Sequence, residues 1–117
     1  MKKFNKAKES EELVIIVNQR EAEKKEKTKA EGTKTWKFHA DNVRDFAFAS
    51  SRKFIWDAKM VPLQNGQKPL AMSFYPKEGN PLWEEESTKA VAATLITYSR
   101  MTVDYPYPVA ISVHTAS

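Results

Sequence analysis

The dipeptide Asn65-Gly66, set between two apolar runs, is the feature that most restricts the fold of this chain. Both residues tolerate positive φ, and Asn-Gly between such runs is the strongest short-range signal for a β-hairpin. The flanking strands are expected within residues 59–63 and 70–75. Pro62 is expected near a sheet edge, because proline has no N–H to donate to a ladder. The centre of the chain is therefore predicted to hold a pair of antiparallel strands.

Two further elements are expected before this hairpin. Residues 13–17, Leu-Val-Ile-Ile-Val, form a β-branched run short enough for a buried strand. Residues 18–30 consist mainly of helix-forming residues with Glu and Lys at four-residue spacing, but Ala22 and Ala30 are their only apolar members. That helix is expected to be weakly held. Residues 1–11 are polar and predicted to be a flexible N-terminus.

Two more strands are predicted between that helix and the hairpin. Residues 35–40 alternate large apolar with polar side chains, which is typical of a half-buried strand with Trp36 and Phe38 pointing inward. Residues 43–49 alternate again, and both faces of this strand are expected to be covered. Phe54 and Trp56 extend the apolar pattern beyond residues 50–53, so a bend or bulge is expected there before a further strand.

The last third of the chain is predicted to be a helix followed by a strand. Residues 75–81 are rich in turn-forming residues, so a boundary is expected there, with residues 12–76 forming one segment and 77–117 a second. Asn80 is the expected N-cap and Pro81 the first helical residue. Glu84, Glu85 and Glu86 would then lie near the positive end of the helix dipole.

One apolar stripe is expected along this helix, which should continue to about residue 103. Its members recur every three or four residues: Trp83, Ser87, Ala90, Val91, Thr94, Leu95, Tyr98 and Met101. Residues 109–114 then form a short buried-type strand. The fold class predicted is α+β, with a mixed or antiparallel sheet, one long C-terminal helix and a weaker N-terminal helix.

Composition fits one modest folded unit without a membrane-spanning segment. The 117 residues are 41% hydrophobic and include only three glycines, whereas the longest purely apolar run has five residues, at 13–17, far short of the roughly 18 needed to span a bilayer. Residues 1–33 contain nine basic and seven acidic residues, and residues 34–117 contain ten basic and eight acidic ones. The net charge of +4 is therefore spread over the chain and not concentrated in a basic arm. The absence of cysteine excludes disulfides and thiolate zinc sites within this sequence.

Motifs for catalysis or metal binding are absent from the sequence. It contains no H-E-x-x-H, no Gly-rich phosphate loop and no G-x-S-x-G. His39 and His114 are the only imidazoles, and a zinc site using both would need carboxylates brought in by the fold. Ordinary surface or strand histidines are the favoured interpretation, so no catalytic, cofactor-binding or metal-binding residue is predicted.

Three other groups of polar residues have a functional and a structural interpretation. Arg44 and Asp45, followed by residues 50–53, could form a polar site, but pairing across a strand ladder is favoured, and Ser50 and Ser51 lack an adjacent base. The run Glu84 to Glu86 could bind a cation, but the helix dipole accounts for it. Basic residues alternate with aromatic ones between residues 34 and 54: Lys34, Lys37, Arg44, Arg52 and Lys53 with Trp36, Phe38, Phe46 and Phe54. Such a pattern could bind single-stranded nucleic acid, but strands of a protein core give the same pattern, and that interpretation is favoured.

Three segments resemble one known protein family. Residues 35–57 (TWKFHADNVRDFAFASSRKFIWD), residues 72–76 (MSFYP) and residues 104–113 (DYPYPVAISV) are similar to blocks found in bacterial zinc metallopeptidases of the aminopeptidase N, or gluzincin, family. The resemblance covers roughly residues 12–117, with the blocks in the same order. It implies that residues 12–76 are the end of a β-rich N-terminal domain and residues 77–117 the start of the catalytic domain.

This resemblance implies a scaffolding role. In the family, the G-x-M-E segment and the H-E-x-x-H zinc motif follow the matched blocks, so no zinc ligand, general base or oxyanion residue is carried over to this chain. Zinc and a peptide substrate are expected only in the intact parent enzyme, and the remainder of that parent chain is the expected partner. The alternatives are a small peptide-binding or single-stranded nucleic-acid-binding module, with nucleic acid the less expected ligand, and a self-standing structural domain.

Overall fold

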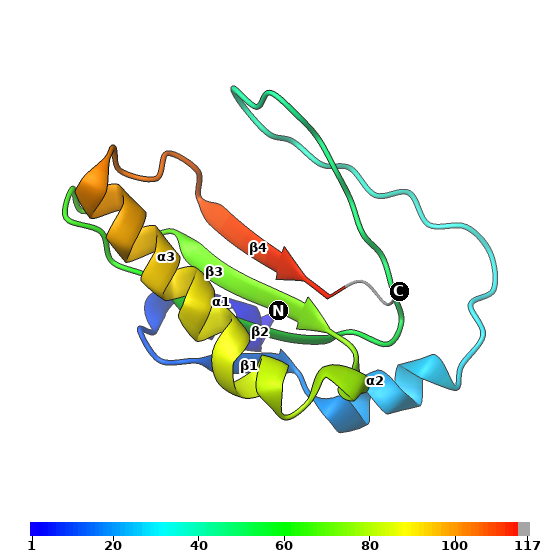
Figure 1. Cartoon of the computed structure of the whole chain (residues 1–117). Coiled ribbons are helices and arrows are strands. Elements are labelled where there is room, and N and C mark those ends of the chain that lie inside the picture. The colour runs from blue at the N-terminus through cyan, green and yellow to red at the C-terminus, as the bar shows by residue number, and fades with distance from the viewer. Residues whose placement is uncertain (115–117) are drawn as a thin grey trace.

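The chain folds around one four-stranded mixed sheet with helices on both faces (Figure 1). The computed structural model describes residues 1–114. The strands lie in the order β1-β2-β3-β4, with β1 and β4 at the edges. The pairs β1–β2 and β2–β3 are antiparallel and β3–β4 is parallel. This confirms the predicted α+β class; the strand bounds are β1 Val14–Val17, β2 Ile55–Met60, β3 Leu70–Tyr75 and β4 Val109–Val113.

The predicted hairpin is confirmed and forms the centre of the sheet, but its first strand lies at Ile55–Met60, earlier than the expected residues 59–63. β2 and β3 pair without interruption from Ile55 opposite Tyr75 to Met60 opposite Leu70. Gly66 has a φ of +84°, which a residue with a Cβ rarely adopts. Because β2 lies between β1 and β3, Pro62 is not on an edge strand; it follows the end of β2, where no ladder bond is lost.

A helical crossover connects the parallel strands β3 and β4, as such a pair requires. It begins with the 3₁₀ turn η1, Lys77–Gly79, and the π-helical turn η2, Trp83–Ser87, and continues as α3, Thr88–Met101. The predicted N-cap is wrong: the Asn80 side-chain amide donates to the Glu84 carboxylate at 3.2 Å and caps no backbone N–H. The boundary predicted between residues 76 and 77 stays a prediction.

Only part of the predicted stripe on α3 faces the sheet. Leu95 is buried as expected, but the other buried residues of α3 are Thr88 and Ala92. Tyr98 and Met101 are 63% and 75% exposed. On this face the hydroxyl of Thr88 binds the buried Asp57 carboxylate on β2, and Ala92 and Leu95 pack on an apolar cluster of the sheet. The helix therefore keeps part of its predicted apolar stripe uncovered.

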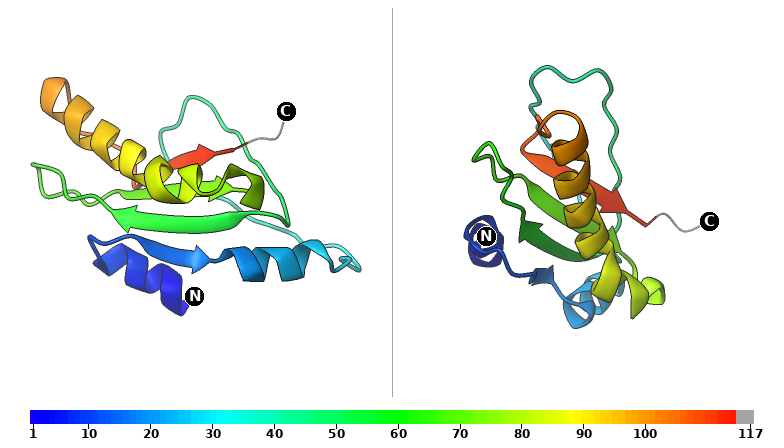
Figure 2. Two further views of the ribbon diagram at one scale, coloured as in Figure 1. Left: turned by 60° about the horizontal axis from the view of Figure 1, so that its bottom comes forward. Right: turned by 60° about the vertical axis from the view of Figure 1, so that its left-hand side comes forward.

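The opposite face of the sheet is covered by α1, Lys2–Glu9, in the segment predicted to be flexible (Figure 2). Ala7 is fully buried in an apolar cluster with residues of β1, β2 and β3, and the ring of Phe4 packs on Trp56 with 5.4 Å between centroids. Periodicity alone did not indicate this helix because only these two side chains anchor it. The first eleven residues are therefore mostly an ordered helix.

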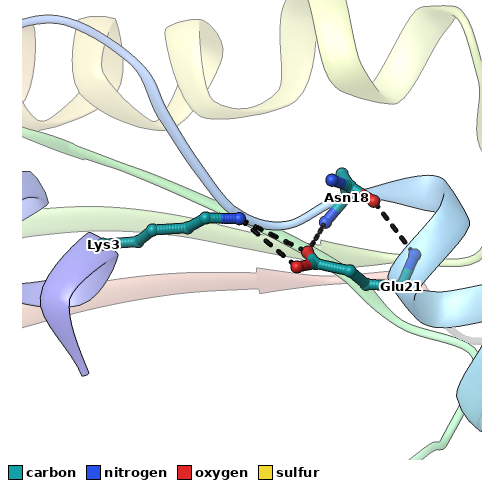
Figure 3. Close-up of polar contacts among 3 residues, drawn as sticks. All are labelled: Lys3, Asn18 and Glu21. Carbon is teal, nitrogen blue, oxygen red and sulfur yellow. Dashed lines mark hydrogen bonds and ion pairs between the residues drawn. The ribbon is translucent and has the colours of Figure 1, made fainter.

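The helix expected within residues 18–30 is confirmed, but it is short: α2 spans Gln19–Glu26. Its start is fixed by a capping box, in which Asn18 Oδ1 accepts the Glu21 N–H at 2.9 Å and the Glu21 carboxylate accepts the Asn18 N–H at 2.9 Å (Figure 3). Lys3 of α1 approaches the same carboxylate at 3.4 Å and so connects the two N-terminal helices.

The two strands predicted for residues 35–40 and 43–49 are wrong. Residues 28–54, here called the aromatic arm, leave the end of α2, bow out beyond β4 and return to the start of β2 without forming a strand or helix (Figure 1). Trp36 and Phe48 are 73% and 82% exposed, so neither predicted face is covered. An alternating pattern does not by itself form a strand, and these residues pair with none of the four strands of the sheet.

Candidate functional site

An apolar groove runs between α3 and the edge strand β4. It has a volume of about 600 Å³ and is lined by Ser87, Ala90, Val91, Thr94, Leu95, Tyr98, Ser99, Thr102, Val103, Tyr105, Pro106, Ala110 and Ser112. The exposed part of the predicted helix stripe forms one wall, and the small side chains of Ala110 and Ser112 on β4 form part of the other. The groove remains open because the small side chains of Ala110 and Ser112 do not fill the space between α3 and β4.

The backbone of β4 is open along the groove. The Leu70 N–H donates to Pro108 O and the His114 N–H donates to Phe74 O, both at 2.9 Å. Even-numbered residues of β4 therefore bond to β3, and the N–H and C=O groups of Val109, Ile111 and Val113 point away from the sheet. The outward carbonyl of Val109 accepts the Tyr105 hydroxyl at 2.9 Å. Within residues 1–114, nothing pairs with the outward groups of Ile111.

A buried carboxylate lies beneath the groove. Asp57 on β2 is fully buried, and its two oxygens accept hydrogen bonds from the hydroxyls of Tyr75 on β3, at 2.7 Å, and of Thr88 on α3. Burial raises the pKa of Asp57, the hydrogen bonds from Thr88 and Tyr75 oppose this increase, and the charge of Glu84 adds to it. Burial and the adjacent carboxylate also raise the pKa of Tyr75.

Hydroxyl groups connect this carboxylate to the groove. Thr88 Oγ1 and Ser73 Oγ are 2.8 Å apart, Ser73 Oγ and Ser87 Oγ are 2.8 Å apart, and Ser87 Oγ and Ser112 Oγ are 3.4 Å apart. Each hydroxyl has one proton to donate. If Asp57 is ionised, Thr88 must donate to it and accept from Ser73; if Asp57 is protonated, the chain can run in the opposite direction. The charge state of Asp57 therefore affects which groups the groove wall presents as donors.

The two histidines do not form a metal site with their surroundings. His39 Nε2 lies 2.9 Å from Asp41 Oδ1 in the exposed aromatic arm. His114, at the end of β4, packs edge-on to Trp83 with 4.9 Å between ring centroids. Within residues 1–114, no three His, Asp or Glu side chains gather closely enough to hold a metal ion.

The polar residues of the arm have structural partners at its base. The ladder pairing predicted for Arg44 and Asp45 is wrong, because no ladder forms there. Arg52 donates to the Thr28 hydroxyl at 2.7 Å, and the Lys53 ammonium lies 3.1 Å from the Glu26 carboxylate. These contacts hold the two ends of the arm together and leave its middle uncovered.

The comparisons with known proteins give no family assignment. No protein-family model, curated protein or solved structure matches this chain. No helix formed by residues 1–114 is long and apolar enough to cross a membrane.

Sequence reasoning missed the buried network of Asp57, Ser73 and Thr88. One signal was present, since Asp57 lies at the centre of an otherwise strand-like stretch, where a charged residue needs a partner. The partner depends on register: Ser73 lies directly opposite Asp57 in the hairpin, and Thr88 reaches both from α3. The sequence predicted the hairpin but neither its register nor the helix rotation.

Proposed function

We propose that this chain is a non-catalytic scaffold unit of a zinc-dependent metallopeptidase of the aminopeptidase N type. The observation that carries the proposal is the apolar groove beside the open edge of β4. A sheet edge with unpaired backbone groups and an adjoining apolar groove is typical of a surface that another segment covers. In this proposal, the remainder of the parent peptidase supplies that segment together with the zinc ligands.

The buried network supports a scaffolding role, because it makes the groove rigid. Asp57, Tyr75 and Thr88 join β2, β3 and α3 by hydrogen bonds that are shielded from water. Fully satisfied polar networks of this kind fix the relative positions of the elements that carry them. A segment that docks against α3 and β4 would therefore meet a surface of fixed shape.

Two measurements test this proposal. Purified protein is expected to contain no stoichiometric zinc by elemental analysis and to cleave no aminoacyl reporter substrate; turnover by the pure chain would contradict it. The proposal also predicts that the coding sequence continues past residue 117 into G-x-M-E and then H-E-x-x-H. A reading frame that continues without these motifs would refute the assignment to this peptidase family.

A second candidate function, a peptide-binding module, is favoured by the outward backbone groups of Ile111. Extended peptides bind other proteins by adding a strand to such an edge, and an adjoining apolar groove then selects their side chains. The test is titration with a labelled Val- and Ile-rich hexapeptide. We expect binding that Ile111→Pro weakens, because proline removes the outward N–H, whereas Leu82→Ser, which alters a separate exposed apolar residue, leaves it unchanged.

Titration with a labelled oligonucleotide distinguishes a nucleic-acid-binding module from a peptide-binding module. The basic residues of the arm and its aromatic residues Trp36, Phe38, Phe46 and Phe48 are exposed, so base stacking is sterically open to these rings. Oligonucleotide binding that weakens steeply with salt, without hexapeptide binding, would replace the peptide module with a nucleic-acid module.

A further inference from the structure

We propose that two copies of this chain associate reciprocally, with the aromatic arm of each copy added along β4 and inserted into the α3–β4 groove of the other. This inference rests on the second candidate function, because it treats the groove as a strand-accepting surface and names its occupant. Each chain carries both surfaces of the proposed contact, the aromatic arm and the α3–β4 groove, and both are uncovered in the single chain. Two copies related by a twofold axis would cover all four surfaces at once.

The arm has the backbone pattern of an added strand. Residues 35–40 alternate Trp36 and Phe38 with polar side chains, so that both rings lie on one side when the segment is extended. Asn42, with a φ of +53°, turns the chain, and the rings of Phe38 and Phe46 then lie 6.3 Å apart across the arm. A two-stranded ribbon is marginal by itself, and pairing with a sheet edge stabilises it.

The groove matches such a strand in shape and position. Even-numbered residues of β4 point toward α3, and two of them, Ala110 and Ser112, line the groove with small side chains. A strand added beside β4 would direct alternate side chains into the same space. Bulky rings from the arm would then fill the volume of about 600 Å³ that the small side chains leave open.

The area available is sufficient for a stable dimer. Four aromatic residues of the arm are well exposed in the single chain: Trp36, Phe38, Phe46 and Phe48. A fully buried aromatic side chain covers roughly 150–250 Å², and these rings are 65–82% exposed, so the eight rings of two reciprocal arms would bury about 800–1,600 Å² of ring surface. With the surfaces that the rings reach counted as well, the contact attains the size of a standard specific interface.

Charge complementarity favours the same arrangement. Residues 28–54 carry six basic and three acidic side chains, a net charge of +3. Glu84, Glu85 and Glu86 precede α3 at the end of the groove where β4 finishes, as the contact of Trp83 with His114 shows. An arm laid along β4 would bring positive charge toward this acidic turn.

The test is sedimentation velocity of the full chain from micromolar to millimolar concentration. We expect a monomer that converts to a dimer and to nothing larger, with moderately weaker association in high salt. The double variant Trp36→Ser/Phe38→Ser and the single variant Ile111→Pro should each weaken dimerisation by about tenfold or more. Leu82→Ser is the matched control, because it removes a 65% exposed apolar side chain outside both surfaces.

Mixing the two variants distinguishes loss of contact from loss of folding. At a concentration between the dissociation constants of the wild type and the variants, each variant alone should be mainly monomeric, with a far-UV circular dichroism spectrum like that of the wild type. Their mixture retains one intact arm and one intact groove that can meet, so heterodimers should reappear. Wild-type protein that stays monomeric, species that grow without limit, or variants that dimerise normally would each overturn the proposal. A monomer that still binds the hexapeptide would overturn the dimer and keep the peptide module.

Discussion

At the scale of single residues, Asp57 should make the stability of the fold depend on pH. Burial raises its pKa above the ordinary value of 3.8, so the folded state holds this proton more tightly than the unfolded state does. Stability from this group is therefore full at pH below the unfolded pKa and is lost as pH rises through the folded pKa. Across that window, the free energy of unfolding should fall by up to about 1.4 kcal/mol per pH unit from this group.

The measurement is urea unfolding of the wild type and of Asp57→Asn between pH 4 and pH 7. Asparagine keeps the shape of the side chain and cannot ionise, so the difference in stability between the two proteins should shift in favour of the variant as pH rises. Only this difference is diagnostic, because surface carboxylates such as Glu21 have a lowered pKa, and their stabilisation is lost as pH falls. Parallel pH profiles would show that Asp57 does not titrate between folded and unfolded states.

Thr88 should be more important for stability than other threonines on the same helix. Thr88→Val keeps the volume and removes the hydroxyl that binds the buried Asp57 carboxylate, which should cost about 1–3 kcal/mol at pH 7. Thr94→Val is the control, because the Thr94 hydroxyl donates only to the exposed carbonyl of Ala90 in its own helix. Its effect should stay within about 0.5 kcal/mol. The free energy of unfolding of both variants is measured with urea. Equal decreases in the two variants would show that the hydrogen bond from Thr88 to Asp57 does not stabilise the fold.

At the scale of elements, α2 should depend on its N-cap more than on its ion pair. Asn18→Ala removes the acceptor for the Glu21 N–H and should cost about 0.5–2 kcal/mol. Lys3→Ala breaks a partly exposed ion pair, and its effect on the free energy of unfolding should be about 0.5 kcal/mol or less. Thermal unfolding of both variants checks the order. If Lys3→Ala were the more damaging, the contact between α1 and α2 would outweigh the cap.

Elements with local signals were predictable from the sequence, and elements that depend on a partner were not. The hairpin at Asn65-Gly66 and the strand over residues 13–17 follow from turn chemistry and β-branched composition, and both are confirmed. Residues 35–49 have an equally strong alternating pattern but no strand beside them, so the pattern is not sufficient. The groove depends on the rotation of α3, which buries Ala92 and Leu95 together with Thr88, and the apolar spacing alone did not predict that the polar Thr88 would share this face.

At the scale of the whole molecule, the chain should unfold as one cooperative unit, although its sequence predicts a boundary between residues 76 and 77. β4 pairs with β3 over five residues, and Thr88 of α3 binds Asp57 of β2, so buried contacts cross that position. Unfolding the second segment alone would expose an unpaired strand and a buried carboxylate, which is more costly than unfolding both segments together.

Two probes of urea unfolding test this cooperativity in the intact chain at concentrations where it is monomeric. Far-UV circular dichroism reports the helices on both sides of residue 76. Tryptophan fluorescence is compared in two double variants that both lack the exposed Trp36. Trp36→Phe/Trp83→Phe keeps Trp56 of β2 as the reporter of the first segment, and Trp36→Phe/Trp56→Phe keeps Trp83 for the second. We expect each variant to give one midpoint that its two probes share. Separate midpoints within one variant would show that the segments unfold independently, and the sheet that joins them would then be too weak to make them a single domain.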